Sequence, residues 1–212
     1  MLKKGQKLNK YQLLELIGEG GEAQIWRAVD TFTNEELALR VIHQHHIRLA
    51  PEITSLFLRE GEILSKIDDP RIIKIYESNV AVIDEKEYYY HAMELVHASD
   101  LGSYLENNKP GWQESLRIFM AVMKTVVFLH EMDDPILHRD LKPANIFLMD
   151  AGDVNSPTQV KIFDFGLARR EFEKTITAAD AFRGTLKFSA PELRDVGGKA
   201  STASEIYSLG VT

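Results

Sequence analysis

The spacing of hydrophobic and polar residues changes once along the chain, near residue 100. Before that point, short β-favouring runs are separated by turns containing Gly, Asn, Asp or Pro. The predicted strands are Leu13–Ile17, Ala23–Val29, Glu36–Ile42, Ile72–Ser78 and Tyr88–Leu95. After it the longest periodic segment is helical, over Ser115–Met132, with Leu116, Phe119, Met123, Val126 and His130 on one face. We therefore predict an α+β protein with a strand-rich lobe, a linker near Glu94–Leu101 and a larger helical lobe.

One helix is predicted inside the first lobe, starting near Pro51. Its apolar stripe follows steps of three and four residues and comprises Ile53, Leu56, Glu60, Ile63 and Ile67. A carboxylate on such a stripe needs a cationic partner or a metal to offset its desolvation. The alternative is that Glu60 lies at the edge of the stripe and reaches water. Glu62, two positions on, is expected on the opposite side of the helix.

Composition narrows the class of protein. The 212 residues carry 25 Lys and Arg against 32 Asp and Glu, a net charge of −7, in an ordinary globular mixture that excludes disorder as the main state. The acidic balance argues against nucleic acid or an anionic membrane as the main partner. The sequence has no cysteine, which excludes disulfides, thiolate zinc sites and cysteine nucleophiles. With neither a signal peptide nor an apolar run of the ~20 residues that span a bilayer, we expect a cytoplasmic protein.

A glycine-rich segment lies where two predicted strands meet, over Ile17–Gly21. Gly18 and Gly20 would let backbone N–H groups come close to phosphates. Such a segment is also common in plain hairpins, and Ala23 stands where a third glycine would help. Taken alone, the segment does not decide between these two interpretations.

A second motif concentrates chemistry after the long helix, over Leu137–Asn145. Asp164-Phe165-Gly166 follows further along, directly after the β-favouring run 160–163, and Ala190-Pro191-Glu192 comes later. The carboxylate of Asp164 and the amide of Asn145 are oxygen ligands suited to Mg²⁺. A further carboxylate, Asp140, can accept a hydroxyl proton, and Lys142 can neutralise a transferring phosphate. The three motifs in this order predict phosphoryl transfer.

With these motifs the sequence resembles the eukaryotic-like (Hanks-type) Ser/Thr protein kinase family over Tyr11–Thr212. The resemblance implies a bilobal fold with an N-terminal extension at 1–10, an N-lobe at 11–93, a hinge at 94–100 and a partial C-lobe at 101–212. It also implies ATP and Mg²⁺ as cofactors and a protein with Ser or Thr as substrate. Lys142, two residues after Asp140, is typical of the Ser/Thr branch.

The resemblance also implies roles for individual residues. Asp140 resembles the catalytic base, Asn145 and Asp164 the metal ligands, and Lys142 the phosphate contact. Glu60 resembles the helix carboxylate that pairs with a strand cation, here Arg40. The residues expected around ATP are Ile17, Gly18, Gly20, Ile25, Ala38, Arg40, Met93, Glu94, Val96 and Asp164, with Met93 gating the pocket and 94–96 offering backbone hydrogen bonds. Thr175 and Thr177 resemble the phosphorylated threonines of bacterial members.

The sequence departs from the family pattern at three places. Arg40 stands where the family has lysine, and Glu22 and Ala23 replace an aromatic residue and a glycine. Glu205 replaces the aspartate of a helix that anchors the large lobe, and the sequence stops inside that helix at Thr212. We therefore expect either a fragment of a longer protein or a truncated kinase.

Three functional classes fit these residues. The first is an ATP-dependent Ser/Thr protein kinase, slowed by Arg40. The second is a pseudokinase that binds nucleotide or acts as a scaffold, and the third is a small-molecule phosphotransferase of related fold. Glu192 in its Ala-Pro-Glu segment and Lys142 argue against the third class, and intact Asp140, Asn145 and Asp164 favour the first over the second.

Two other clusters have simpler interpretations. His43, His45 and His46 could be read as a metal site, but their spacing after a strand predicts side chains on different faces. Tyr88–Tyr90 is expected to be a strand that packs against the helix rather than a stacking platform.

Overall fold

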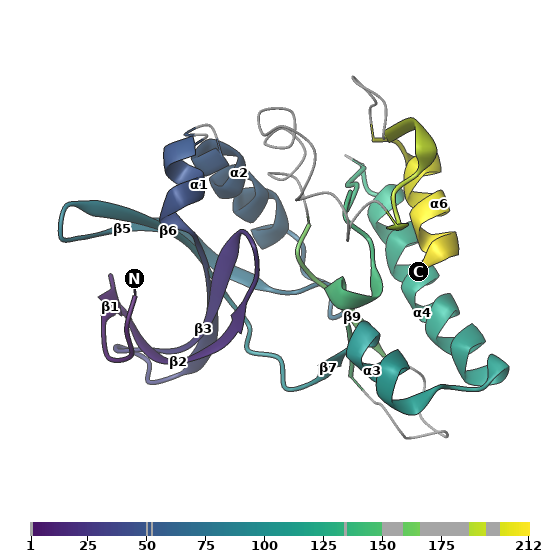
Figure 1. The fold of residues 1–212 in the computed structure, drawn as a ribbon, viewed down its shortest axis with the longest axis horizontal. Coiled ribbons are helices and arrows are strands. Elements are labelled where there is room, and N and C mark those ends of the chain that lie inside the picture. The colour runs from purple at the N-terminus through teal and green to yellow at the C-terminus, as the bar shows by residue number, and fades with distance from the viewer. Residues whose placement is uncertain are drawn as a thin grey trace. The chain divides into compact units, whose positions relative to one another are not determined.

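The computed structural model describes residues 2–49, 51, 53–133, 135–149, 159–165, 187–193 and 200–212. The predicted phosphosites Thr175 and Thr177 lie outside these residues. The chain forms two compact units (Figure 1). The first unit comprises Met1–Asp69 and Ile73–Val96, and the second comprises Pro70–Ile72 and His97–Thr212.

The first unit is built on an antiparallel sheet with the strand order β1-β2-β3-β4-β6-β5. The strands are β1 (Lys7–Leu8), β2 (Tyr11–Glu19), β3 (Ala23–Asp30), β4 (Glu36–Ile42), β5 (Ile75–Ile83) and β6 (Lys86–Met93). The predicted strand at 36–42 has the bounds of β4. The predictions for the last two strands are shifted, because β5 begins at Ile75 rather than Ile72 and β6 ends at Met93 rather than Leu95.

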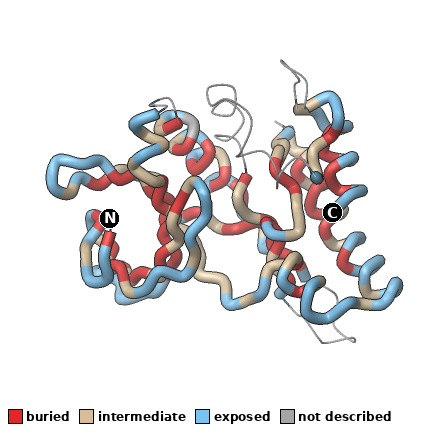
Figure 2. Tube along the Cα trace, in the orientation of Figure 1, coloured by how far each residue is buried: buried red, intermediate tan, exposed pale blue. Residues whose placement is uncertain are grey.

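One face of this sheet carries the apolar core of the unit, seen as red segments of the strands in Figure 2. Leu8, Leu13 and Leu39 are fully buried there. The rings of Tyr11 and Tyr90 meet edge to face with centroids 5.7 Å apart, a favourable arrangement for aromatic quadrupoles. The core thus packs a residue of β2 against a residue of β6, which are not neighbours in the sheet.

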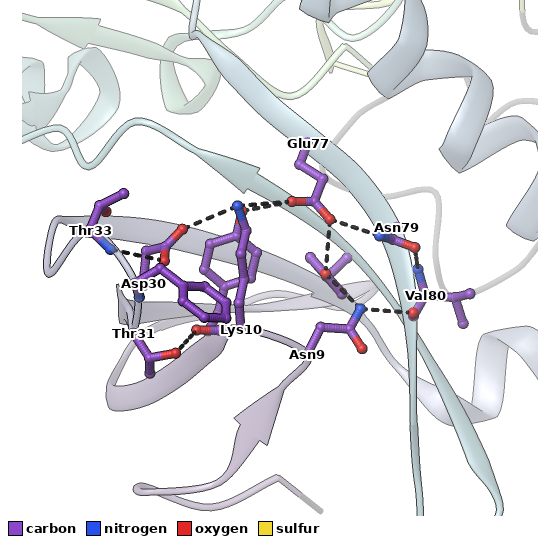
Figure 3. Close-up of polar contacts among 11 residues, drawn as sticks. Asn9, Lys10, Asp30, Thr31, Thr33, Glu77, Asn79 and Val80 are labelled. Carbon is purple, nitrogen blue, oxygen red and sulfur yellow. Dashed lines mark hydrogen bonds and ion pairs between the residues drawn. The ribbon is translucent and has the colours of Figure 1, made fainter.

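A polar network closes one end of the sheet (Figure 3). Lys10 Nζ lies 3.1 Å from Asp30 Oδ2 and 3.5 Å from Glu77 Oε2, and the hydroxyl of Tyr11 donates to Glu77. The N–H of Phe32 and the Lys10 side chain hold the pKa of Asp30 below its usual range. The network connects the turn before β2 to the end of β3 and to β5.

Two helices complete the first unit, α1 (Gln44–Leu49) and α2 (Ile53–Ser65). The buried positions of α2 are Ile53, Phe57, Glu60, Gly61 and Leu64. Glu60 is 2% exposed, so the alternative that it reaches water is wrong. The predicted stripe is only partly correct, because Ile63 is half-buried and Phe57 and Gly61 belong to the buried face; the side chain of Leu56 is not described.

Gly61 is the point of closest approach of α2 to the sheet. A Cβ placed on Gly61 would lie 1.6 Å from Ser78 Oγ and 2.7 Å from both Ser78 Cβ and His91 Cε1. Any side chain there would push α2 away from β5 and β6. Glycine is therefore required by packing, since its φ is not in the left-handed region.

The second unit combines helices with a small sheet of order β7-β8-β9, formed by Ser99–Asp100, Ile146–Leu148 and Val160–Ile162. Its helices are α3 (Leu101–Asn108), α4 (Trp112–His130) and α6 (Thr202–Val211), with 3₁₀ turns at Pro143–Asn145 and Pro191–Leu193. Asp100 caps α3 by accepting from Ser103 N at 2.9 Å. Ser201 and Ser204 form a capping box at the start of α6.

The face predicted for the long helix is not the buried one, although Val126, one of its five residues, is buried. The buried residues of α4 are Ile118, Val122, Thr125, Val126 and Leu129, whereas Leu116 is 50% and Phe119 is 39% exposed. The helix is apolar around most of its circumference, so the apolar pattern fits several faces. The buried face is hard to recognise because it includes the polar residue Thr125. Burial of Thr125 is tolerated because its hydroxyl donates to the carbonyl of Ala121. In the part of the chain that the structure describes, no helix is both long and apolar enough to cross a bilayer.

We expect Gly61→Ala to destabilise the first unit by up to about 2 kcal/mol, since overpacking costs ~1–3 kcal/mol and the gain in helix propensity offsets at most ~1 kcal/mol. Gly210→Ala in α6 is the matched control, because a Cβ there meets no atom within 4 Å. That variant is expected to be neutral or slightly stabilising. Urea unfolding followed by the fluorescence of the buried Trp26 measures the first unit, and equal midpoints for the parent and Gly61→Ala would contradict the prediction.

Candidate active site

The predicted site residues of the first unit lie on neighbouring strands. Gly18, Ile25, Arg40 and His91 are successive cross-strand partners over β2, β3, β4 and β6. Ala38 pairs with Met93 in the same way. Residues paired across an antiparallel sheet share a face, so sheet register brings the predicted positions together and adds His91, which was not predicted.

The other predicted positions of this unit lie beside that row. Ile17 precedes Gly18 in β2 and is 47% exposed, and Gly20 directly follows β2. Glu94 and Val96 follow the end of β6. Glu94 is fixed by two bonds, because its N–H donates to Lys74 O at 3.0 Å and its carboxylate accepts from Lys74 N at 2.6 Å.

Arg40 and Glu60 meet as a buried ion pair. The distance from Arg40 Nη1 to Glu60 Oε2 is 3.6 Å, and the two side chains are 13% and 3% exposed. The guanidinium also lies over the Phe57 ring, 5.3 Å from its centroid. The contact expected between these two side chains is therefore present, with α2 supplying both the carboxylate and the aromatic ring.

His91 is a buried neighbour of this pair that the sequence analysis missed. Its side chain stacks on Phe57 with centroids 3.6 Å apart, and its Nδ1 lies 2.7 Å from Ser78 Oγ. Burial, and then the charge of Arg40, hold the pKa of His91 well below its usual range. His91 is thus neutral beside the Arg40 cation. A signal was available in the sequence, since His91 is a polar residue in a mostly apolar stretch. It lies two positions before Met93 and therefore on the same face of the strand.

In the second unit, His138 ties the Asp140 loop to the end of β9. Its Nε2 donates to the carbonyl of Phe163 at 2.9 Å, and its Nδ1 accepts from Asp140 N at 3.3 Å. The ring is fully buried and packs against Phe165 with centroids 4.5 Å apart. These contacts fix Asp140 relative to the segment that carries Asp164.

Asp140 is the centre of a compact polar cluster. Its Oδ2 accepts from Lys142 Nζ at 2.7 Å and from Asn145 Nδ2 at 3.1 Å. Asn145 Nδ2 also donates to the carbonyl of Asp140 at 2.9 Å. Asp140 and Asn145 are buried, at 5% and 4% exposure. Two residues predicted for this loop, Lys142 and Asn145, therefore contact Asp140 directly.

Asn145 and Asp164 lie at matching ends of paired strands. Asn145 precedes β8, and Ile146 pairs with Ile162 at the end of β9. Phe163 N donates to Asn145 O at 3.1 Å, which places the next residue, Asp164, beside the same strand end. Asp164 has a φ of 58°, an uncommon conformation for a residue with a side chain.

This donor set fits a magnesium ion. The amide nitrogen of Asn145 is engaged by Asp140, so the amide presents Oδ1 as its ligand atom. With the Asp164 carboxylate it offers the one or two protein oxygens that Mg²⁺ takes when phosphates and water complete its shell. Among the described residues no group of three or more His, Cys, Asp or Glu could hold a metal, so an all-protein cage is absent there.

Glu205 supports the Asp140 loop from α6. Its Oε1 accepts from Arg139 N at 2.6 Å, and its Oε2 lies 2.6 Å from His130 Nε2 on α4. Arg139 adopts a φ of 68°, a strained conformation that this charge-assisted bond stabilises. The glutamate that departs from the family pattern thus reaches the loop next to Asp140.

The spacing of the three histidines after β4 had predicted side chains on different faces, and this prediction is wrong. The ring centroids lie 5.3 Å apart for His43 and His45, 4.0 Å for His45 and His46, and 6.3 Å for His43 and His46. His43 precedes α1 and the other two lie in its first turn, so the change from strand to helix turns the rings toward one another. The prediction of Tyr88–Tyr90 as strand is correct.

The comparisons with known proteins all identify protein kinases. A family model described as protein kinase domain matches residues 11–212. The chain is 32% identical over 203 residues to the serine/threonine-protein kinase PrkC of Bacillus subtilis, covering 95% of this chain and 29% of that protein. It is 30% identical over 204 residues to PknA of Mycobacterium tuberculosis, covering 95% of this chain and 45% of the relative. The chain therefore spans less than half the length of these two relatives.

Solved structures agree on the fold. A structure titled PpkA-294 apo form superposes with a TM-score of 0.74 at 17% identity, covering 99% of this chain and 76% of that one. Rad53 1-466 in complex with AMP-PNP gives a TM-score of 0.68 at 26% identity, covering 95% and 46%. The α+β architecture expected from the sequence is thus that of the protein kinases.

The depressed pKa of His91 makes stability depend on pH. Below about pH 6.5 the unfolded chain binds a proton at this histidine that the folded chain does not, so the free energy of unfolding falls as pH falls. One group contributes at most ~1.4 kcal/mol per pH unit. We expect urea unfolding between pH 7 and pH 5 to show this loss in the parent, and a smaller slope in His91→Gln.

His97→Gln, which removes an exposed histidine, is the control for that experiment. The comparison uses slopes against pH rather than absolute stabilities, because His91→Gln also loses packing on Phe57. Carboxylates with lowered pKa, such as Asp30, add their own loss at lower pH in all three proteins. Equal slopes for the parent and His91→Gln would refute the assignment of the pH dependence to His91.

Proposed function

Because the chain belongs to the protein kinase family, in its Hanks-type Ser/Thr branch, we propose that it transfers the γ-phosphoryl group of ATP to a Ser or Thr hydroxyl of a protein. The observation that carries this proposal is the buried cluster in which Lys142 and Asn145 both bond to the carboxylate of Asp140. Such a cluster holds a base and a cation together, as transfer to a hydroxyl requires. An ATP-dependent reaction also agrees with the cytoplasmic location that we propose from the sequence.

In the proposed reaction the substrate hydroxyl oxygen forms a bond to the γ-phosphorus of ATP. The bond from that phosphorus to the β–γ bridging oxygen breaks, and ADP leaves. Asp140 orients the hydroxyl and accepts its proton, while the ammonium of Lys142 stabilises the charge on the transferred group. Asn145 Oδ1 and the Asp164 carboxylate would hold Mg²⁺, which neutralises phosphate charge when bound.

The first unit supplies the proposed nucleotide contacts. Ile17, Ala38 and Met93 would pack against the adenine, and the backbone of 94–96 would hydrogen-bond to its edge. Gly18, Gly20 and Ile25 would lie along the phosphates, where small residues allow backbone contact. Arg40 would contact the α- and β-phosphates while Glu60 holds its guanidinium.

A second candidate function is a pseudokinase that binds nucleotide without transferring phosphate. The observation in its favour is the position of Arg40, whose guanidinium is engaged by Glu60 and by the ring of Phe57. An arginine held in this way reaches the phosphates less closely than a compact ammonium, which can contact the phosphates and the carboxylate together. We propose a slow kinase, because the base and both metal ligands are retained.

Asp140→Asn tests the proposed base. We expect it to keep Mg²⁺-dependent ATP binding and to lower phosphoryl transfer to casein at least ~10²-fold, the usual contribution of a positioned base. Asp68→Asn is the control, since that carboxylate is 92% exposed and pairs with Lys74. Equal transfer rates for Asp140→Asn and the parent would exclude Asp140 from the mechanism.

Arg40→Lys separates the slow kinase from the pseudokinase. Displacement of the phosphates by ~1 Å can lower a rate ~10²-fold, so we expect lysine to raise kcat at least about tenfold. ATP turnover with casein as acceptor measures the change. A lower kcat in Arg40→Lys would mean a site adapted to arginine, and no transfer by either protein would favour the pseudokinase.

A further inference from the structure

The histidines after β4 hold the tip of the glycine-rich loop by its backbone. The carbonyl of Gly20 accepts from His43 Nε2 at 2.9 Å, and the carbonyl of Gly21 accepts from His46 Nε2 at 2.7 Å. The next carbonyl, of Glu22, accepts from the backbone N–H of His43 at 2.9 Å. Three consecutive carbonyls of the loop are therefore bonded to one short segment at the end of β4.

These bonds fix the direction of the loop amides. In a trans peptide the N–H points away from the preceding carbonyl, and the chain contains no cis peptide among the described residues. Because the carbonyls of Gly20 and Gly21 point toward the imidazoles, the N–H groups of Gly21 and Glu22 point to the opposite side. Backbone N–H groups aligned in this way are donors suited to phosphate oxygens.

The loop has little side-chain packing of its own at this position. A Cβ on Gly21 would meet no atom within 4 Å, and one on Gly20 would meet only the carbonyl of Ala23, at 3.9 Å. Neither glycine has a φ in the left-handed region. The two glycines are therefore not needed for a left-handed backbone conformation, and they leave space for an approaching ligand. The position of the tip depends on its hydrogen bonds.

The third histidine packs beside the two donors without bonding to the loop. The ring of His45 lies 4.0 Å from that of His46 and 5.3 Å from that of His43, centroid to centroid. Desolvation and these two neighbours lower the pKa of His45. The cluster therefore has two members that donate to the loop and one that only packs.

We propose that His43 and His46 are positioning residues for ATP, which hold the glycine-rich loop so that the amides of Gly21 and Glu22 face the phosphates. The proposal rests on the kinase function and adds to it two residues outside the recognised motifs. It predicts that losing either imidazole donor weakens binding of the phosphates and leaves binding of the adenosine moiety intact.

The experiment compares two replacements at each histidine. His43→Phe and His46→Phe keep a ring and lose the donor, whereas His43→Gln and His46→Gln keep an N–H near the position of Nε2. Calorimetry measures the Kd of Mg²⁺–ATP and of adenosine for each variant and for the parent. His45→Phe is the matched control from the same cluster.

Each Phe variant should raise the Kd for ATP about three- to tenfold, the effect of one hydrogen bond, with the Kd for adenosine unchanged. The Gln variants and His45→Phe should bind ATP within about twofold of the parent. Unchanged ATP binding in both Phe variants, an equal loss for ATP and adenosine, or no restoration by Gln would each overturn the proposal. Failure of the parent to bind ATP would instead refute the kinase function on which the proposal rests.

Discussion

The buried pair of Arg40 and Glu60 is the constraint on which the first unit depends. A carboxylate that is 3% exposed is tolerated only with a compensating cation, and removal of one partner from such a pair typically costs 3–5 kcal/mol. Arg40 comes from β4 and Glu60 from α2, so the pair fixes the helix against the sheet. Gly61 permits this approach because it has no side chain. His91 permits it by remaining neutral, since a second buried cation would repel Arg40.

The second unit also contains a buried carboxylate, that of Glu205. Glu205 is 2% exposed on α6, and its carboxylate bridges His130 on α4 and the backbone N–H of Arg139. The positive φ of Arg139 costs of order 1–3 kcal/mol, and a bond from a backbone N–H to a carboxylate offsets part of that strain. Asp140 follows Arg139 directly. The helix that carries Glu205 therefore helps to set the position of the proposed base.

Local pattern was sufficient for some of these features. The strand at 36–42 was predicted with its observed bounds because alternation and turn residues are both local signals. The helical stripe left two possibilities for Glu60, burial beside a cation or exposure at the edge, and the structure shows that it is buried. Phe57 and Gly61 were not expected on that face. The face of α4 was predicted wrongly because most of the helix is apolar, and only the packing of the unit selects Ile118 and its neighbours.

The features that sequence reasoning missed depend on residues far apart in the chain. His91 is significant because register places it opposite Arg40, and no local pattern gives register between β4 and β6. His43 and His46 bond to a loop more than twenty positions earlier, and their three-residue spacing suggested divergence until the start of α1 turned the rings together. Motifs identified the residues that we propose to act on a substrate, whereas the residues that support them were found only in the structure.

The arginine at position 40 joins these supports to the proposed chemistry. A lysine ammonium is a compact charge on a flexible stem, whereas a guanidinium is planar and stacks on aromatic rings. Arg40 uses both properties, because it pairs with Glu60 and lies over Phe57, two residues of the same helix. Arg40 therefore attaches α2 to the sheet through two contacts. In the proposed kinase these contacts would limit the freedom of the cation to follow the phosphates. In the slow kinase that we propose, stability of the first unit and speed of phosphoryl transfer would place opposing demands on one side chain.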